Sequence, residues 1–193
     1  TIPIGDVLTA ACMINAFCCR EVEKLDAPAE IKKDLVVVGG GPGGLEAAWL
    51  AAKRGHKVTL YEKDEQGGGN LRIGAIPPYK QEFFSAIQYF KTMGHKYGVE
   101  FRLGQEADVE KIMADKPDIV ILATGSKPII PNIPGMDKVN TTTAEEVLLG
   151  TKEAKGKVLI IGGASVGCEV ADFLGEYGHD ISVVEMLSSL GNG

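Results

Sequence analysis

Cysteine and histidine are scarce in this chain of 193 residues, which contains four of the former and three of the latter. Four cysteines, two of them adjacent at Cys18 and Cys19, do not form the pattern of a secreted disulfide scaffold. We therefore expect a cytoplasmic location. The three histidines, His56, His95 and His179, each follow a glycine. They are expected to be solvated residues at turns or helix ends.

Long apolar runs and an excess of basic residues are also missing. No apolar stretch is long enough to span a bilayer without a charge or a glycine, and the apolar residues 7–19 lack the basic leader of a signal peptide. The net charge of −6 and the pI near 5.2 disfavour nucleic acid and anionic membranes as partners. With 45% hydrophobic and 24% charged residues, the chain has the composition of an ordinary globular protein.

Glycine is abundant, with 25 residues, and two clusters of it follow the same pattern. The first cluster, at residues 39–44 (Gly-Gly-Gly-Pro-Gly-Gly), comes after an apolar run and before a predicted strand that ends at Glu62. The second, at residues 162–167 (Gly-Gly-Ala-Ser-Val-Gly), is placed in the same way before a strand that ends at Glu185. A glycine fingerprint between a strand and a helix, followed by an acidic residue, is typical of a dinucleotide site.

Each glycine of such a fingerprint has a separate role. Gly39 permits the tight turn, Gly41 lets the backbone approach a diphosphate, and Gly44 lets the helix pack against its strand. The diphosphate would lie at the positive end of the helix dipole, and the acidic residue would accept hydrogen bonds from ribose hydroxyls. Either fingerprint could instead be a structural turn without ligand, the second more easily because Ala164 stands at its middle glycine.

Two further segments lie between the fingerprints. The glycine-rich stretch 66–71 offers backbone amides to a second phosphate of a bound nucleotide, or it is a plain surface loop. The stretch 118–125 is predicted to be a buried strand that ends in Ala123, Thr124 and Gly125. Small residues at the carboxyl end of a strand permit close approach of a ligand. The prolines that follow indicate an extended crossover.

Hydrophobic periodicity predicts the order of the elements. After an irregular or short helical arm at 1–33, we expect strand 35–39, helix 43–54, strand 57–62, helix 79–97, strand 99–103, helix 109–113 and strand 118–124. Thr143 and Glu146 predict a capping box at the start of a helix, and a second βαβ unit is expected from Lys157. The predicted core stripe of helix 79–97 consists of Phe83, Phe84, Ile87, Phe90 and Met93.

The order of these motifs resembles the flavoprotein oxidoreductases with two dinucleotide-binding domains. The matching residues are Glu62-Lys63, Gly67–Leu71, Ile76-Pro77-Pro78 and Gly167-Cys168-Glu169. They are most similar to the NADH:flavin oxidoreductase family, of the 2,4-dienoyl-CoA reductase and enoate reductase type. The resemblance implies an α/β fold with a Rossmann-like, doubly wound parallel sheet of the FAD/NAD(P)-binding type, in three layers and truncated.

The resemblance also implies a domain organisation and two cofactors. Residues 1–33 would be an N-terminal arm, 34–136 the first half of an FAD-binding domain, and 137–193 the start of an incomplete NAD(P)H-binding domain. FAD would bind the first fingerprint and NADH the second, because Glu185 would repel the 2′-phosphate of NADPH. The implied cofactor-binding residues are Gly39, Gly41, Pro42, Gly43, Gly44, Glu62, Lys63, Gly69, Asn70, Leu71, Ala107, Ala123, Thr124, Gly125, Gly162, Gly163, Val166, Gly167 and Glu185.

The segment around Cys12 resembles the end of the family's iron–sulfur segment, although Ala16 replaces a proline. By this resemblance Cys12 would be the fourth thiolate of a [4Fe–4S] cluster, with three ligands upstream. We expect a piece of a larger enzyme, not active alone, whose partners are an FMN barrel and the remaining iron–sulfur segment. Electrons would pass from NADH through FAD and the cluster to FMN, which reduces an activated carbon–carbon double bond. Since cofactors supply this chemistry, no catalytic acid, base or nucleophile is predicted here.

Two other functions stay open. One is a non-redox ADP-binding module of a trimethylamine-dehydrogenase-like enzyme, which would be colourless. The other is a ferredoxin-reductase-like flavoprotein. A disulfide reductase is disfavoured because the chain contains no C-x-x-C or C-x4-C pair. A naturally short subunit is the alternative to a piece, and an unpaired sheet edge would invite homo-oligomers.

Overall fold

The computed structural model describes residue 12 and residues 14–191. The described chain divides into two compact units. The first unit comprises the described residues up to Gln66 together with Tyr89–Ala123, and the second comprises Gly67–Gln88 and the chain from Thr124 onward. Every strand pair of the described residues is parallel, which confirms the predicted α/β class.

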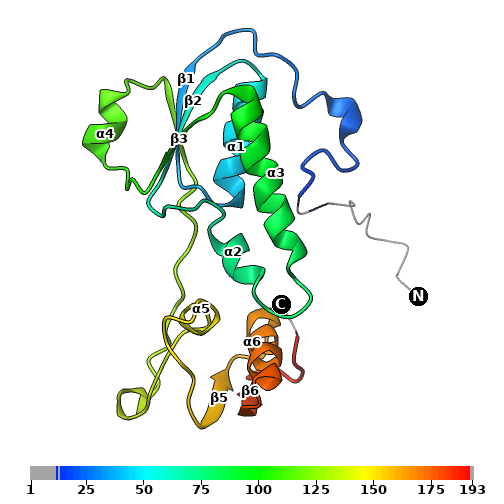
Figure 1. The fold of residues 1–193 in the computed structure, drawn as a ribbon, viewed down its shortest axis with the longest axis vertical. Coiled ribbons are helices and arrows are strands. Elements are labelled where there is room, and N and C mark those ends of the chain that lie inside the picture. Colours follow the sequence, from blue (N-terminus) through cyan, green and yellow to red (C-terminus); the bar gives the residue numbers. More distant parts are fainter. Residues whose placement is uncertain (1–11, 13, 192–193) are drawn as a thin grey trace. The chain divides into compact units, whose positions relative to one another are not determined.

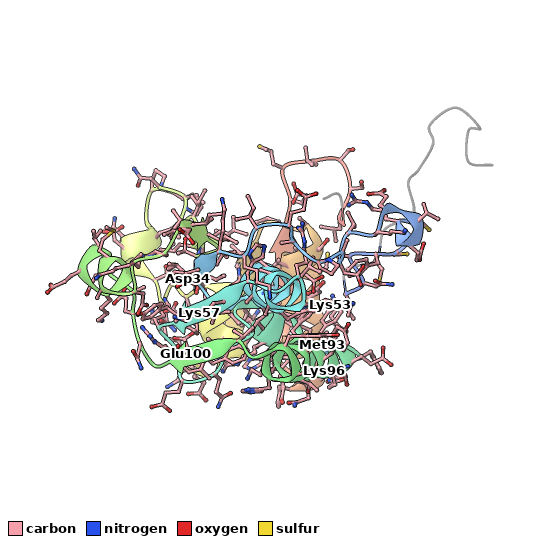
Figure 2. The ribbon with its side chains drawn as sticks, turned by 90° about the horizontal axis from the view of Figure 1, so that it is seen from above. Asp34, Lys53, Lys57, Met93, Lys96 and Glu100 are labelled. Carbon is pink, nitrogen blue, oxygen red and sulfur yellow. The ribbon has the colours of Figure 1, made fainter. Side chains whose placement is uncertain are left out.

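The first unit contains a four-stranded parallel sheet in the order β3-β2-β1-β4. Its strands are β1 (Asp34–Val38), β2 (Lys57–Glu62), β3 (Glu100–Leu103) and β4 (Ile119–Leu122). Figure 1 shows α1 (Pro42–Lys53) on one side of the sheet and α4 (Val109–Ala114) on the other, so three layers form. In Figure 2, Asp34, Lys57 and Glu100 mark the end of the sheet where β1, β2 and β3 begin. The turns that follow these strands therefore lie at the opposite end.

The buried strands β1 and β2 hold the first strand-turn-helix unit in place. After their first residues both strands are buried or partly buried throughout, as expected for parallel strands covered on two faces. α1 begins at Pro42, whose fixed φ suits the first helical position, and ends with Lys53 near its carbonyl groups. Its buried face includes Leu45 and Trp49, which are 1% and 2% exposed. The turn between β1 and α1 is thus held between two well-packed elements.

The second unit contains a two-stranded parallel sheet, β5 (Lys157–Ile161) and β6 (Asp180–Val184), connected through α6 (Ser165–Glu176). It also contains α2 (Asn70–Gly74), the short helix η2 (Met136–Lys138) and α5 (Ala144–Leu148). The core consists of Val147, Leu148, Val170 and Leu174, with Ile73 and Ile76 packed against it. α3 (Glu82–Tyr97) contributes residues to both units.

Most predicted elements are confirmed within a few residues, and the described part of the arm contains one short helix, η1 (Glu21–Glu23). The predicted burial of the strand at 118–125 is wrong, because β4 is the last strand of the sheet order and its Val120 and Leu122 are 41% and 73% exposed. The capping box is also confirmed, because the Thr143 hydroxyl accepts a hydrogen bond from the Glu146 N–H while the Glu146 carboxylate accepts one from the Thr143 N–H. α2 was not expected. The core stripe is wrong for Phe84, which is 48% exposed while Ile87 and Phe90 are buried. Each residue turns the helix by about 100°, so the adjacent residues Phe83 and Phe84 cannot both lie on the same narrow face.

No helix of the described residues combines the length and apolar character that crossing a membrane requires.

Candidate dinucleotide-binding sites

The first fingerprint forms a closed turn that Glu62 holds from the neighbouring strand. Gly39 has φ +106° and donates its N–H to the Tyr61 carbonyl at 2.8 Å. The N–H of Gly40 donates to Oε2 of Glu62 at 2.6 Å, and the Asp64 N–H donates to Oε1 at 2.9 Å. Glu62 is only 7% exposed. The carboxylate therefore has a fixed position beside the turn, and its oxygens can accept further hydrogen bonds.

Two glycines of this turn differ in whether the fold requires glycine at their position. A Cβ atom on Gly44 would lie 1.8 Å from the carbonyl oxygen of Gly39, so only glycine permits this approach of helix and turn. Gly41 has φ −71° and ψ 179°, which any residue adopts, and a Cβ there would meet no heavy atom of the described chain within 4 Å. Folding does not require glycine at position 41. Open space in front of the helix start fits a ligand that approaches the backbone.

The charges at the start of α1 also suit an anion. In the described structure no side chain caps the α1 N-terminus, so its first N–H groups are not satisfied by a capping residue. The first turn of α1 contains no acidic residue, and the same is true of α6. Among the other described α-helices, α3, α4 and α5 each contain glutamate in the first turn, the usual complement to the helix dipole, whereas the five-residue α2 does not. The two fingerprint helices thus leave the positive end of the dipole for an external anion.

The second fingerprint repeats the first 123 residues later, Gly39 corresponding to Gly162 and Glu62 to Glu185. The counterpart contacts are Gly162 N to Val184 O at 2.9 Å, Gly163 N to Glu185 Oε2 at 2.7 Å and Leu187 N to Glu185 Oε1 at 2.8 Å. A Cβ on Gly167 would lie 1.9 Å from the Gly162 carbonyl oxygen. The two turns therefore have the same local structure.

The ionisation of Glu185 follows from these contacts. Hydrogen bonds from the backbone N–H groups of Leu187 and Gly163 lower the pKa of this carboxyl group, because they stabilise its charged form. Glu185 is half-buried at the end of β6. A negative charge is therefore fixed beside the second turn at neutral pH.

Comparison with known proteins agrees with this geometry: residues 33–193 match the pyridine nucleotide-disulphide oxidoreductase family. The chain belongs to this family. Membership implies an FAD- and NAD(P)H-binding module of a flavoprotein oxidoreductase.

The relatives are considerably longer than this chain. NADH oxidase of Thermoanaerobacter brockii is 44% identical over 188 residues, which cover 95% of this chain and 29% of that protein. Cinnamate reductase of Clostridium sporogenes is 42% identical over 182 residues, covering 94% and 27%. The structure of a 2-naphthoyl-CoA reductase in complex with 2-naphthoyl-CoA superposes with TM-score 0.83 and 36% identity, covering 90% of this chain and 26% of that one. The chain thus spans less than a third of these relatives.

The predicted site residues are divided between the two units. Ala123 joins the first turn, since its N–H donates to the Val38 carbonyl at 2.8 Å and its Cβ lies 3.2 Å from where a Cβ of Gly44 would be. Thr124 and Gly125 belong to the second unit. Gly69, Asn70 and Leu71, at the start of α2, also belong to the second unit.

The remaining predicted residues are exposed or half-buried. Lys63 is exposed immediately after β2, and Ala107 is half-buried in the loop before α4. Val166 is 59% exposed in the first turn of α6. Pro42 and Gly43 form the exposed first residues of α1.

Gly40 is the site residue that the sequence reasoning missed. A Cβ on it would lie 3.0 Å from the Cβ and Oε2 atoms of Glu62, so glycine permits the hydrogen bond to that carboxylate. Its counterpart Gly163 was included among the predicted residues. Matching the two fingerprints position by position would have identified it.

Cys12 is exposed, and its sulfur accepts a hydrogen bond from the Asn15 N–H at 3.4 Å. This bond and one from the Ile14 backbone lower the pKa of the thiol, which favours the thiolate that metals bind. Within residues 12 and 14–191, no three His, Cys, Asp or Glu side chains gather into a metal site.

Proposed function

We propose that this chain is the FAD- and NADH-binding part of a multi-cofactor oxidoreductase of the enoate reductase type. FAD would bind at Gly39–Gly44 and NADH at Gly162–Gly167. Electrons from NADH would pass through FAD to a [4Fe–4S] cluster and to an FMN barrel, where an activated carbon–carbon double bond is reduced. The observation that carries the proposal is an arrangement that occurs twice. In each case a helix begins without a side-chain cap, and a glutamate beside that start is held by a backbone N–H group. The names NADH oxidase and cinnamate reductase among the relatives support this class of reaction.

The residues of the first unit fit FAD. The space open at Gly41 would admit a diphosphate to the N–H groups at the start of α1, where the dipole favours its charge. The Glu62 carboxylate, held by two backbone N–H groups, would accept hydrogen bonds from the ribose. FAD, when bound, supplies the redox chemistry, and the chain binds and orients it.

Glu185 supports NADH rather than NADPH as the reductant. Its carboxylate would lie beside the adenosine ribose, where NADPH carries a 2′-phosphate. At a separation of about 4 Å the repulsion is about 1–4 kcal/mol for effective dielectric constants between about 80 and 20. That energy corresponds to about fivefold to several-hundred-fold discrimination.

Cys12 would supply one thiolate to the [4Fe–4S] cluster, with three further ligands from elsewhere in the full-length protein. The lowered pKa of this thiol supports the assignment. A cluster ligand in residues 1–33 would also explain why the resemblance to the enoate reductase type extends upstream of the first fingerprint.

The test is purification of the full-length protein, release of its nucleotide by denaturation and chromatographic identification. The proposal predicts a yellow protein that contains FAD and is reduced anaerobically faster by NADH than by NADPH. A colourless protein that releases ADP would contradict it and would support the ADP-binding module. Equal rates of reduction by NADH and NADPH would contradict only the role of Glu185 in cofactor selection.

A further inference from the structure

The two fingerprint turns differ at three positions, Gly41/Ala164, Pro42/Ser165 and Gly43/Val166, and the first of these lies immediately before the helix. Gly41 precedes α1 with φ −71° and ψ 179°, and Ala164 precedes α6 with φ −71° and ψ −173°. Both are the residues immediately before the first helical residue. The two backbones are therefore superposable there, and one carries a methyl group while the other does not.

The alanine at this position has no conformational cost for the fold. The dihedral angles of Ala164 lie in the extended region that all L-residues adopt. Around Gly41, a Cβ would meet no heavy atom of the described chain within 4 Å. The Ala164 methyl, in the same local geometry, therefore points into the space in front of its helix start.

That space is a cavity in the second unit. Its volume is about 760 Å³, and it is lined by Gly162, Ala164, Val166 and Gly167 from the fingerprint and by Ile161 from β5. Ala164 itself is exposed. A ligand bound at the second turn would therefore meet the methyl group of Ala164, whereas Gly41 presents no side chain at the same position of the first turn.

We propose that Ala164 weakens dinucleotide binding at the second fingerprint and speeds its release, an inference that rests on the proposed function. The reductant has to bind and leave in every turnover, whereas FAD remains bound. A methyl group beside the diphosphate lowers affinity without removing the amide donors or Glu185. Differences of this kind between similar sites are mainly differences in dissociation rate. Ala164 is thus an affinity-setting residue at the position just before the helix, where the two turns have nearly the same backbone angles.

The experiment compares Ala164→Gly and Ala164→Val with the natural full-length protein, using NADH, ADP-ribose and adenosine as probes. Removing the methyl is expected to tighten NADH and ADP-ribose binding by about fivefold or more and to slow their dissociation by a similar factor. The Ala164→Val variant should bind both more weakly by a comparable factor. Adenosine, which has no diphosphate, should bind all three proteins equally. Since glycine is favoured over alanine at a helix N-cap, the Ala164→Gly variant should fold normally.

The outcomes separate this inference from the proposed function. If NADH binds the natural protein and Ala164→Gly with the same affinity and dissociation rate, the role of Ala164 is refuted while the second site stands. That role is equally refuted if adenosine binding changes as much as ADP-ribose binding. If none of the three proteins binds NADH, the proposed function fails as well.

Discussion

Alanine substitutions at Gly41 and Gly44 distinguish a glycine needed for ligand binding from a glycine needed for packing. In Gly44→Ala the new Cβ would lie 1.8 Å from the Gly39 carbonyl oxygen and 3.0 Å from its carbon, and both are backbone atoms that cannot rotate away. Overpacking of this kind costs about 1–3 kcal/mol, and the short distance predicts the upper part of that range or more. In Gly41→Ala the methyl meets nothing. The reduced freedom of the unfolded chain contributes about 0.4–1 kcal/mol, but this is offset because glycine is favoured over alanine at a helix N-cap, so stability should change little.

The assay has two parts. Urea unfolding of this chain can be followed by the fluorescence of Trp49, its single tryptophan, which is 2% exposed on α1. FAD affinity is measured on the full-length protein by flavin fluorescence. Gly41→Ala should unfold at nearly the same urea concentration as the natural chain but bind FAD about 5- to 150-fold more weakly, the factor that corresponds to about 1–3 kcal/mol. Natural FAD affinity in Gly41→Ala would refute the reasoning, and so would natural stability in Gly44→Ala.

Three further outcomes are expected. Glu185→Gln should reduce the preference for NADH over NADPH by about fivefold or more, measured as the ratio of anaerobic reduction rates, and an unchanged ratio would remove Glu185 from cofactor selection. The pKa of Glu146 is lowered to about 2 by hydrogen bonds from the Thr143 N–H and from Lys152. Its contribution to stability is therefore present above the ordinary pKa and is lost as pH falls toward about 2, so the melting temperature of Glu146→Gln should depend less on pH over that interval. Cys12→Ser in the full-length protein should lose the iron–sulfur absorption and electron paramagnetic resonance signals while retaining FAD, and an intact cluster would contradict its assignment.

The fingerprint units could be predicted from the sequence because every local signal agrees there. Apolar runs, glycines and a terminal glutamate specify strand, turn, helix and strand, and the structure has β1, α1 and β2 within one residue of the expected bounds. The packing role of Gly44 is confirmed for the same reason, since it depends on contacts within a single βαβ unit.

Features that depend on distant parts of the chain could not be predicted. α2 begins directly after three glycines that locally favour a loop, and it is stabilised by packing of Ile73 on the core of the second unit. Phe84 satisfies an apolar pattern but lies outside the face that Ile87 and Phe90 bury. The sequence can identify Gly40 only as the counterpart of Gly163, whereas its hydrogen bond to the distant Glu62 is seen in the structure.

The central claim is that the starts of α1 and α6 bind two different dinucleotides. The most direct measurement is a crystal structure of the full-length protein with FAD and a non-reducing NADH analogue. The account predicts one diphosphate against the backbone N–H groups that follow Gly41 and another against those that follow Ala164, with Glu62 and Glu185 at the two adenosine riboses. Both nucleotides bound elsewhere, with Gly39–Gly44 facing only solvent or protein, would contradict it.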